Sequence, residues 1–447
     1  MPYIANTVED QQQMLKTIGC QNLEEMWQKA GVTNPAPELK NFPEGLSEPD
    51  LVKHFQHYAE KNDSALTCFL GGGFYDHFIP AAVPALVNRG DFATAYTPYQ
   101  AEASQGTLQS IFEYQSAICE LTGMPVANAS LYDGGTAAFE AILMAVRIKR
   151  KKMRVVISDT VSPLYRQIMA TSTIGHDIDL AVVKTEASES QDNLQALLDC
   201  VDDNTAAVVV QYPNFLGGIA DYRLFIEKLH AKKVLAISVS YPIAFGMLET
   251  PGKMGFDIVV GEGQCLGISL NGGGPYLGYM AVKEEYMRKM PGRVVGKAFD
   301  KDGKEGYVLT LQTREQHIRR QHAMSNICSN ENLCALTALV YMCLLGKEGI
   351  VEVAQQCAAK AVYLYNRLNK VPGCKVVGDG AFFNEFVLEL PSDAETFAKA
   401  FLDQGIAGGL PLGQFYPERK NQLLVAVTEK RTKAEIDHFC QVLEKLL

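Results

Sequence analysis

The stretch "FDIVVGEGQCLGISLNGGGPYLGYMAV" (256–282) decides the fold of this chain. It holds two short apolar runs separated by a segment with a glycine cluster at 272–274. Short runs rich in β-branched residues recur earlier, with helical or turn-rich segments between them, at 154–159, 179–185, 206–212 and 233–240. Strands that are apolar on both faces and alternate with helices are typical of a parallel sheet covered on both sides. The pattern therefore predicts a doubly wound, mainly parallel α/β domain that binds ligands at the carboxyl ends of its strands.

Three regions with different patterns indicate the domain organisation. Residues 1–65 predict a helical N-terminal arm, and residues 66–325 hold the alternating pattern of the large α/β domain. After that, two long helical patterns precede the order strand, strand, helix, strand, helix. Residues 326–447 are therefore expected to form a small C-terminal α+β domain.

Composition and charge exclude several classes of function. The 447 residues include 41 basic and 51 acidic side chains, a formal net charge of −10, which disfavours nucleic acid as a partner. We see neither an apolar run near about 18 residues nor a signal-peptide pattern, so no membrane association is expected. Eleven cysteines without any C-x-x-C pair favour reduced thiols and a cytoplasmic location.

Two local features of the sequence have the residue types of a ligand site. The basic run "RIKRKKMR" (147–154) is interpreted as a solvated helix end, because cations suit a helix C-terminus, with a phosphate-contacting patch as the alternative. His54 and His57 lie three residues apart on a predicted helix, but no third ligand is nearby. No other histidine spacing matches a metal motif, so no metal site is predicted.

The motif "SLYDGGTAAFEAIL" (130–143) places two glycines directly before a strong helical pattern. Backbone N–H groups at such a turn approach an anion closely, and the helix N-terminus adds partial positive charge. Gly134, Gly135 and Thr136 are therefore candidate phosphate ligands. The alternative is an ordinary N-cap and tight turn.

Two loops rich in glycine, proline and tyrosine carry side chains that suit a small zwitterion or a cofactor ring. These are "GGGFYDHFIPAAV" (71–83) and "DFATAYTPYQAEASQG" (91–106). They supply ring and amide groups without fixed charge from Tyr75, His77, Tyr96, Tyr99 and Gln100. An equally good and compatible interpretation is that the tyrosines anchor an arm between subunits.

Two residues that pyridoxal phosphate enzymes need are missing at the expected strand ends. The Schiff-base lysine is expected after the strand at 256–262, where Gln264 and Cys265 stand instead. A carboxylate that keeps the pyridine nitrogen protonated is expected in "AISVSYP", where Ser238 and Ser240 stand. Two independent absences indicate a lobe that keeps the fold without autonomous chemistry.

Other kinds of catalysis have weaker support in the sequence. Cys265 is conceivable as a nucleophile, but no feature identifies a base for it. A self-sufficient pyridoxal phosphate enzyme needs a lysine elsewhere. The nearest candidates, none of them at the strand end, are Lys232, Lys233, Lys253 and Lys283.

Long motifs make the whole chain resemble the glycine cleavage system P-protein family. The resemblance rests on "GFYDHFIP" (73–80), on 96–141 with its "YTPYQAEASQG" start, and on "LQTREQHIRRQHAMSNICSNENLCAL" (311–336). The length and the lysine-free "GEGQCLG" are similar to the N-terminal half of that family, which many bacteria encode as a separate alpha subunit. The resemblance implies a pyridoxal phosphate-dependent transferase fold of type I and an alpha2beta2 assembly.

The resemblance further implies a division of labour between the subunits. The beta subunit carries the lysine and the pyridoxal phosphate, glycine is decarboxylated, and the aminomethyl group passes to the lipoyl group of H-protein. On this chain His77, Tyr96, Tyr99 and Gln100 are then expected to face the partner's site or the lipoyl channel, and Gly134, Gly135 and Thr136 form a vestigial turn. The basic run at 147–154 is a candidate contact for H-protein. A rival hypothesis is a noncatalytic scaffold for the beta subunit.

Overall fold

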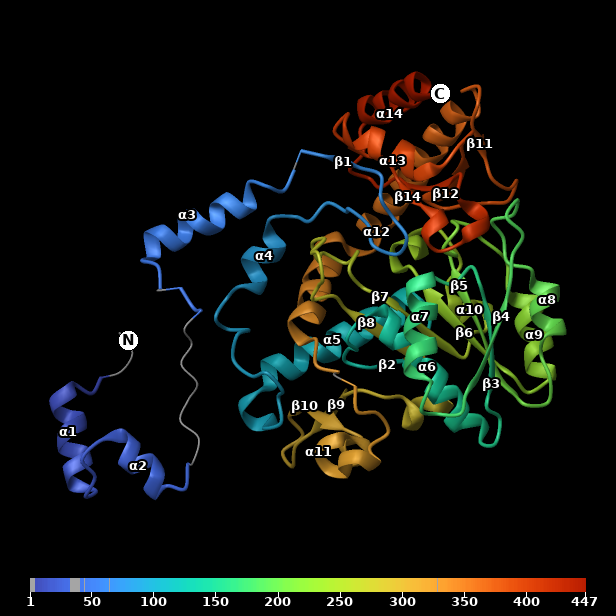
Figure 1. Cartoon of the computed structure of the whole chain (residues 1–447). Helices are drawn as coiled ribbons and strands as arrows, with labels where there is room; N and C mark the ends of the chain where they lie inside the picture. Colours follow the sequence, from blue (N-terminus) through green and yellow to red (C-terminus); the bar gives the residue numbers. More distant parts are fainter. Residues whose placement is uncertain (1–4, 33–40, 44, 64, 328) are drawn as a thin grey trace. The chain divides into compact units, whose positions relative to one another are not determined.

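A seven-stranded sheet forms the centre of the computed structural model, which describes residues 5–32, 41–43, 45–63, 65–327 and 329–447 (Figure 1). In spatial order its strands are β2 (Val126–Ala127), β8 (Gly278–Val282), β7 (Ile258–Glu262), β6 (Leu235–Ser240), β5 (Thr205–Tyr212), β3 (Arg154–Ser158) and β4 (Asp179–Val183). Neighbours from β7 to β4 are parallel, whereas β8 runs antiparallel to both β7 and β2. The predicted, mainly parallel sheet is confirmed.

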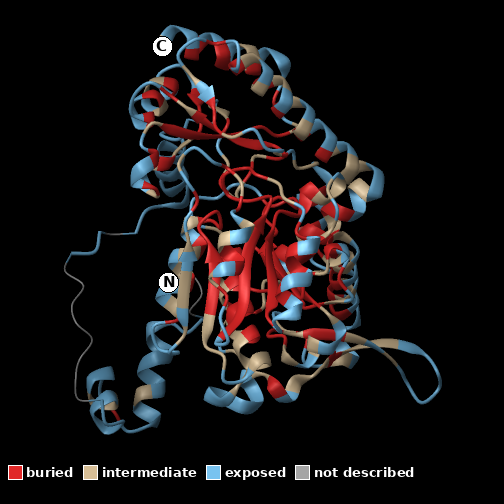
Figure 2. Ribbon diagram, turned by 90° about the vertical axis from the view of Figure 1, so that its right-hand side faces the viewer, coloured by how far each residue is buried: buried red, intermediate tan, exposed pale blue. Residues whose placement is uncertain are grey.

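Helices cover both faces of this sheet, and Figure 2 shows the sheet as the buried centre between them. On one face α6 (Gly134–Lys149) and α7 (Pro163–Ser172) share a buried cluster with the strands. The opposite face is covered by α4 (Ala82–Val87), α5 (Gln105–Thr122), α8 (Leu194–Asp199) and α9 (Arg223–Ala231). Within β3, Val155 and Ile157 belong to the first cluster and Val156 to the second. Burial on both faces explains why these strands are apolar throughout.

A long helix, α12 (Asn332–Leu368), connects the large sheet to a second core. The sequence predicts two helices here, and the backbone is indeed non-helical at Gly346, with φ of 61°. Buried side chains from Cys334 to Cys357 pack in the cluster on the face of α5, and those from Ala361 to Leu368 pack in the C-terminal core. Among the described residues, α12 is the one helix that is long and apolar enough to cross a membrane by length and composition alone.

The C-terminal core is built on a four-stranded antiparallel sheet. Its strands, in spatial order, are β11 (Lys375–Val376), β12 (Glu385–Glu389), β15 (Gln422–Ala426) and β14 (Leu410–Pro411). The helices α13 (Ala394–Leu402) and α14 (Lys433–Leu446) join the same buried cluster. This is the predicted α+β arrangement, although residues 65–447 together form one compact unit and a domain boundary at 325 stays a prediction.

Several shorter elements were not predicted. An antiparallel hairpin joins β9 (Val294–Phe299) to β10 (Glu305–Thr310), and β1 (Thr67–Cys68) pairs in parallel with β13 (Ile406–Ala407). Strands of two residues are too short for any periodicity to show. The remaining short helices are α10 (Pro251–Met254), α11 (Gln316–Arg319) and 3-10 turns at Ala101–Ala103, Pro242–Gly246, Glu284–Lys289, Gln312–Arg314, Arg320–His322, Leu412–Gln414 and Pro417–Arg419.

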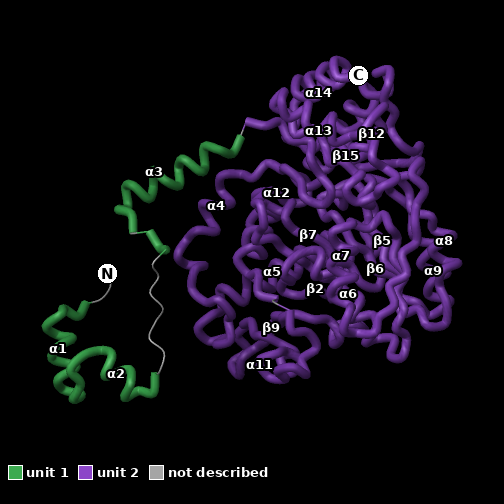
Figure 3. Tube along the Cα trace, viewed as in Figure 1, with its two compact units in different colours: residues 1–64 green, residues 65–447 purple. Residues whose placement is uncertain are grey.

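The N-terminal residues 1–64 form a separate unit (Figure 3). Its described part contains α1 (Val8–Thr17), α2 (Leu23–Lys29) and α3 (Glu48–Ala59), none of which has a buried residue. Each helix begins at a side-chain cap, and at the start of α3 the Ser47 hydroxyl accepts a hydrogen bond from the Asp50 N–H. The capped helices agree with the helical pattern that the sequence shows in this region.

Candidate functional site

The carboxyl ends of β6 and β7 meet a segment that crosses the molecule between the two sheets. This crossing segment, residues 71–80, follows β1 and carries the sequence "GGGFYDHFIP". It contacts the strand ends through Tyr75 and the C-terminal core through Asp76 and His77. The predicted site at the strand ends is therefore covered by the chain itself.

Gln264 is buried, and both ends of its amide are bound within the chain. Its Oε1 accepts from the Tyr75 N–H at 2.9 Å, and its Nε2 donates to the carbonyl oxygens of Tyr75 at 3.2 Å and Ile268 at 2.8 Å. The neighbouring Cys265 is also buried, and burial raises the pKa of its thiol well above the ordinary value. A protonated thiol is a poor nucleophile, so the cysteine hypothesis gains no support here.

The two serines at the end of β6 bind each other. Ser238 and Ser240 are buried, and their hydroxyl oxygens lie 2.7 Å apart. The next residue, Tyr241, stacks on Tyr75 with 4.3 Å between the ring centroids. No negative charge is present on these side chains to hold a proton on a pyridine nitrogen.

The start of α6 is closed by a carboxyl group of the same chain. Glu262, the last residue of β7, accepts hydrogen bonds from the N–H groups of Gly134 at 2.9 Å, Gln264 at 2.9 Å and Leu277 at 3.0 Å. Thr136 and Asp133 form a reciprocal capping box. Burial raises the pKa of Glu262 to about 8, against an ordinary 4.5. An anion brought to this turn meets a carboxyl group that already uses the Gly134 donor.

A glycine is required at Gly134 and at Gly135 for close packing. A Cβ at Gly134 would lie 2.6 Å from the Tyr165 hydroxyl and 2.9 Å from Glu262, and one at Gly135 would lie 2.5 Å from Ile168. Both glycines are buried in this way by side chains of the same chain. The turn thus has a structural reason for its glycines that is independent of any phosphate.

A second buried carboxyl group holds the beginning of the crossing segment. Glu385, at the start of β12, accepts from the Gly72 N–H at 2.7 Å and from the Tyr75 hydroxyl at 3.4 Å. Burial raises its pKa to about 8. Gly72 has a φ of 77°, a conformation that favours glycine.

His77 is buried and uses both ring nitrogens within the chain. Nδ1 lies 2.6 Å from a carboxylate oxygen of Glu429, and Nε2 makes a short contact with the Tyr241 hydroxyl. The other oxygen of Glu429 accepts from the Phe78 N–H at 2.6 Å. Burial opposes ionisation of Glu429, but the hydrogen bond and charge of His77 outweigh it and lower its pKa. His77 therefore ties the crossing segment to the loop after β15.

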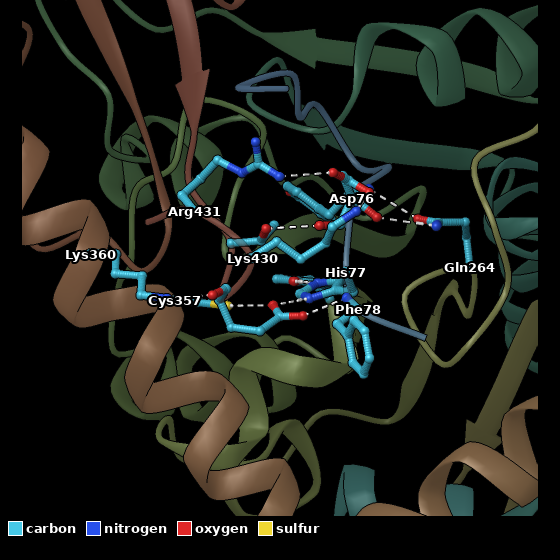
Figure 4. A network of polar contacts seen from close by, with 12 residues as sticks. Asp76, His77, Phe78, Gln264, Cys357, Lys360, Lys430 and Arg431 are labelled. Carbon is cyan, nitrogen blue, oxygen red and sulfur yellow. Dashed lines mark hydrogen bonds and ion pairs between the residues drawn. The ribbon is translucent and has the colours of Figure 1, made fainter. Parts of the chain in front are cut away.

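Asp76 makes the second tie between the same two segments, and Figure 4 shows Lys430 and Arg431 extending towards it. Its carboxylate accepts from Lys430 Nζ at 2.6 Å and from Arg431 Nη2 at 3.2 Å.

The thiol of Cys357, on α12, donates to the Glu429 carboxylate at 3.5 Å. Among the described residues, His77, Cys357 and Glu429 form the one group that could hold a metal, with ligand atoms within 4.8 Å of one another.

These contacts test whether the chain offers a place for pyridoxal phosphate. At the position where the sequence predicts a lysine, the amide of Gln264 is bonded at both ends, and where it predicts a carboxylate, the two serines bind each other. The donor at the start of α6 is used by Glu262. Tyr75 and Tyr241 are buried side by side at the strand ends. The residues present do not fit a cofactor held by this chain.

The second predicted loop, residues 91–106 and here called the tyrosine loop, makes its contacts away from the ends of β6 and β7. Tyr96 and Tyr99 are 76% and 50% exposed, and Gln100 is exposed as well. Tyr99 accepts from Arg293 Nη2 at 3.3 Å, and its ring centroid lies 5.1 Å from that of His317. The tyrosine loop therefore lies beside the segment that follows β10. Its exposed rings are available to another chain, whereas His77 is not.

Sequence reasoning missed the three glutamates that organise the site, of which Glu262 and Glu385 are buried and Glu429 is half-buried. Glu262 stood inside the quoted stretch, and an acidic residue ending a wholly apolar strand was a usable signal. Glu385 and Glu429 gave no comparable signal, because their partners lie more than 300 residues away in the sequence. Long-range pairings of this kind require the folded chain.

The architecture is that of the pyridoxal phosphate-dependent enzymes of fold type I. A sphingosine-1-phosphate lyase from Burkholderia pseudomallei matches with a TM-score of 0.66 over 94% of both chains, at 17% identity, and this likeness concerns the fold alone. The model of the family "Glycine cleavage system P-protein" matches residues 1–443, and the chain belongs to that family.

Individual relatives agree over the full length. The chain is 48% identical over 447 residues to a probable glycine dehydrogenase (decarboxylating) subunit 1 of Geotalea daltonii, and 45% identical to that of Moorella thermoacetica, with all of each chain covered. A crystal structure of glycine decarboxylase (P-protein) of the glycine cleavage system, in inhibitor-bound form, matches with a TM-score of 0.91 at 38% identity, covering 100% of both chains.

Proposed function

We propose that this chain is the cofactor-free subunit of a two-subunit glycine decarboxylase of the glycine cleavage system. The second subunit carries the pyridoxal phosphate. The observation that carries the proposal is the crossing segment, whose Tyr75 binds Gln264 at the place of the missing lysine. The relatives' designation as subunit 1 supports the existence of a partner. The assembly proposed is an alpha2beta2 heterotetramer in the cytoplasm.

In this assembly the partner decarboxylates glycine on its pyridoxal phosphate, and the aminomethyl group passes to the lipoyl group of H-protein. This chain contributes a rigid wall and the exposed tyrosine loop. Tyr96 and Tyr99 present large apolar rings with hydroxyl groups, a combination that is effective at subunit interfaces. His77 acts indirectly, because it holds the crossing segment against the C-terminal core.

The test is glycine–carbon dioxide exchange measured with labelled bicarbonate in the presence of lipoylated H-protein. The chain alone and the partner subunit alone are compared with the equimolar mixture. Exchange is expected in the mixture and absent from this chain alone. Exchange by this chain without its partner would contradict the proposal.

The rival scaffold hypothesis is separated by a variant in the tyrosine loop. Tyr99→Phe removes the hydroxyl that accepts from Arg293 and leaves the ring in place. If the loop faces the partner's site, exchange falls while assembly, followed by size-exclusion chromatography, is unchanged. Unchanged exchange in an intact complex favours the scaffold. The matched control is Tyr363→Phe on α12, whose hydroxyl binds Asp437 in the C-terminal core.

A further inference from the structure

A cavity of about 880 Å³ lies between α6, α7 and the segment 313–327, all within residues 65–447. Apolar side chains form most of its wall, among them Phe139, Leu143, Val146, Met153 and Ile178. Its volume falls in the range of ordinary small-molecule pockets, about 300–1,000 Å³. The residues of the crossing segment do not line it, so this cavity is separate from the site described above.

Arg314 lines the cavity, and two of its buried donors have no partner. The residue is 8% exposed, and its Nη2 donates to the Gly292 carbonyl oxygen at 2.7 Å. Its Nε and Nη1 are buried without a hydrogen bond, and the nearest carboxylate, that of Glu315, lies 3.9 Å from Nε. Buried charged groups are normally paired and fully hydrogen-bonded. Arg314 is thus an incompletely satisfied cation at the wall of an open space.

Arg147 approaches the same cavity from the last turn of α6. Its Nη1 donates to the Met324 carbonyl oxygen, but Nε and Nη2 are buried without a hydrogen bond. Glu140, two turns earlier on α6, lies 3.9 Å from Nη2, and its Oε2 also lacks a hydrogen-bond partner. The basic run at 147–154 is therefore more than a solvated helix end, because its first member points into the protein.

The charges around the cavity are unbalanced. Among its lining residues, Arg147, Arg314 and Arg319 stand against one acidic side chain, Glu140. Burial lowers the pKa of both Arg147 and Arg314, and it raises that of Glu140, which reduces its value as a counter-ion. A guanidinium stays protonated in proteins, so this imbalance favours the binding of an anion.

The start of α6 does not account for this anion preference. Thr136 lines the cavity, but its hydroxyl donates to Asp133 at 2.8 Å and its N–H donates to the same carboxylate at 2.7 Å. The free donors belong to the two arginines. The unpaired Nε and Nη2 groups of Arg147 share one edge of its guanidinium and suit the two oxygens of a carboxylate or phosphate, whereas Nε and Nη1 of Arg314 are on different edges and each offer a single hydrogen bond.

We propose that this cavity binds a small organic anion, with a carboxylate or phosphate group between Arg147 and Arg314 and an apolar body along α6. Both oxyanions satisfy the same donors, so the shared chemistry is an anionic oxygen group on an apolar body. The volume of the cavity and its apolar wall favour an organic anion over inorganic phosphate, which would fill little of the space. This site is independent of the proposed role in glycine cleavage.

Isothermal titration calorimetry of the full-length chain tests the proposal, with octanoate and octyl phosphate as anionic probes. Octanol is the neutral comparator, and inorganic phosphate is the comparator without an apolar body. We expect saturable binding of one anion per chain, and binding of octanol and of inorganic phosphate at least tenfold weaker. Equal binding of octanol would overturn the role of the arginines.

Variants locate the site. Arg314→Gln is expected to weaken the anionic probes at least tenfold, and Arg147→Gln provides the same test if the first variant does not fold, as judged by circular dichroism. Arg223→Gln is the matched control, because Arg223 is exposed and pairs with Asp221 on the far face. Unchanged binding in both cavity variants refutes the assignment.

The same titration is repeated on the complex with the partner subunit. Retained binding supports a ligand site of the assembled protein. Loss of binding on assembly would overturn the proposal and assign the two arginines to carboxylates of the partner. Failure of the anion test leaves the glycine–carbon dioxide exchange result unaffected, so the two proposals fail separately.

Discussion

Replacing Glu262 with glutamine is expected to change how stability depends on pH. The buried carboxyl group keeps its proton up to a pKa of about 8 in the folded chain, against 4.5 ordinarily. Folding therefore takes up a proton between these two values. Protonation of Glu262 therefore contributes most to the free energy of unfolding near pH 4.5, and this contribution is lost as the pH rises towards 8.

The magnitude follows from the pKa and the hydrogen bonds. One proton contributes at most about 1.4 kcal/mol per pH unit, hence up to about 2.7 kcal/mol between pH 6 and pH 8. Glu262→Gln loses that dependence. At pH 6 the variant is less stable by about 1–3 kcal/mol, because an amide cannot accept from the Gly134 N–H with its nitrogen. The deficit narrows as the pH rises.

Urea unfolding followed by circular dichroism at pH 6, 7 and 8 measures this. The matched control is Glu227→Gln on the exposed face of α9, which should leave the pH dependence unchanged. Glu385 titrates in the same window and remains in both proteins, so the comparison isolates one group. Parallel stability curves for Glu262→Gln and the wild type would refute the assignment of a buried, protonated carboxyl group.

Three further changes test the crossing segment. His77→Gln removes the ring nitrogens that bind the Glu429 carboxylate and the Tyr241 hydroxyl, and the free energy of unfolding is expected to fall by roughly 2 kcal/mol in urea titration. A loss below about 0.5 kcal/mol would contradict a stabilising role for these two contacts. Gly72→Ala strains a φ of 77° and places a Cβ 3.1 Å from Leu410, so a lower melting temperature is expected in calorimetry, and an unchanged one would show that the turn is not constrained. Gln264→Lys introduces a lysine without the other cofactor ligands, so no absorbance of a pyridoxal phosphate Schiff base is expected after incubation with the cofactor. A stoichiometric chromophore would show that this single substitution is sufficient for cofactor binding.

The fold was predictable because its signal is local and repeated. Apolar runs such as 206–212 and 233–240 are buried on both faces, and this burial shows directly in the composition of a strand. The reversal of β8 and the hairpin of β9 and β10 were not predictable in the same way, since strand direction depends on connections rather than on composition.

The candidate site was predictable only in part. The absence of a lysine after β7 can be read from the sequence, as can the serines at the end of β6. The contacts that close the ends of β6 and β7 cannot be read from the sequence. Tyr75 binds Gln264, 189 residues away, and His77 binds Glu429, 352 residues away. The resemblance groups the tyrosine loop with His77, whereas in the folded chain His77 is buried against Glu429 and Tyr99 is exposed beside Arg293 and His317.

The most direct test of the central claim is reductive labelling of the purified chain. The chain is incubated with pyridoxal phosphate and reduced with borohydride, and any modified lysine is mapped by mass spectrometry, first alone and then with the partner subunit. We predict no specific label on this chain in either case, and one stoichiometric label on a lysine of the partner. A single stoichiometric label on a lysine of this chain would contradict the account.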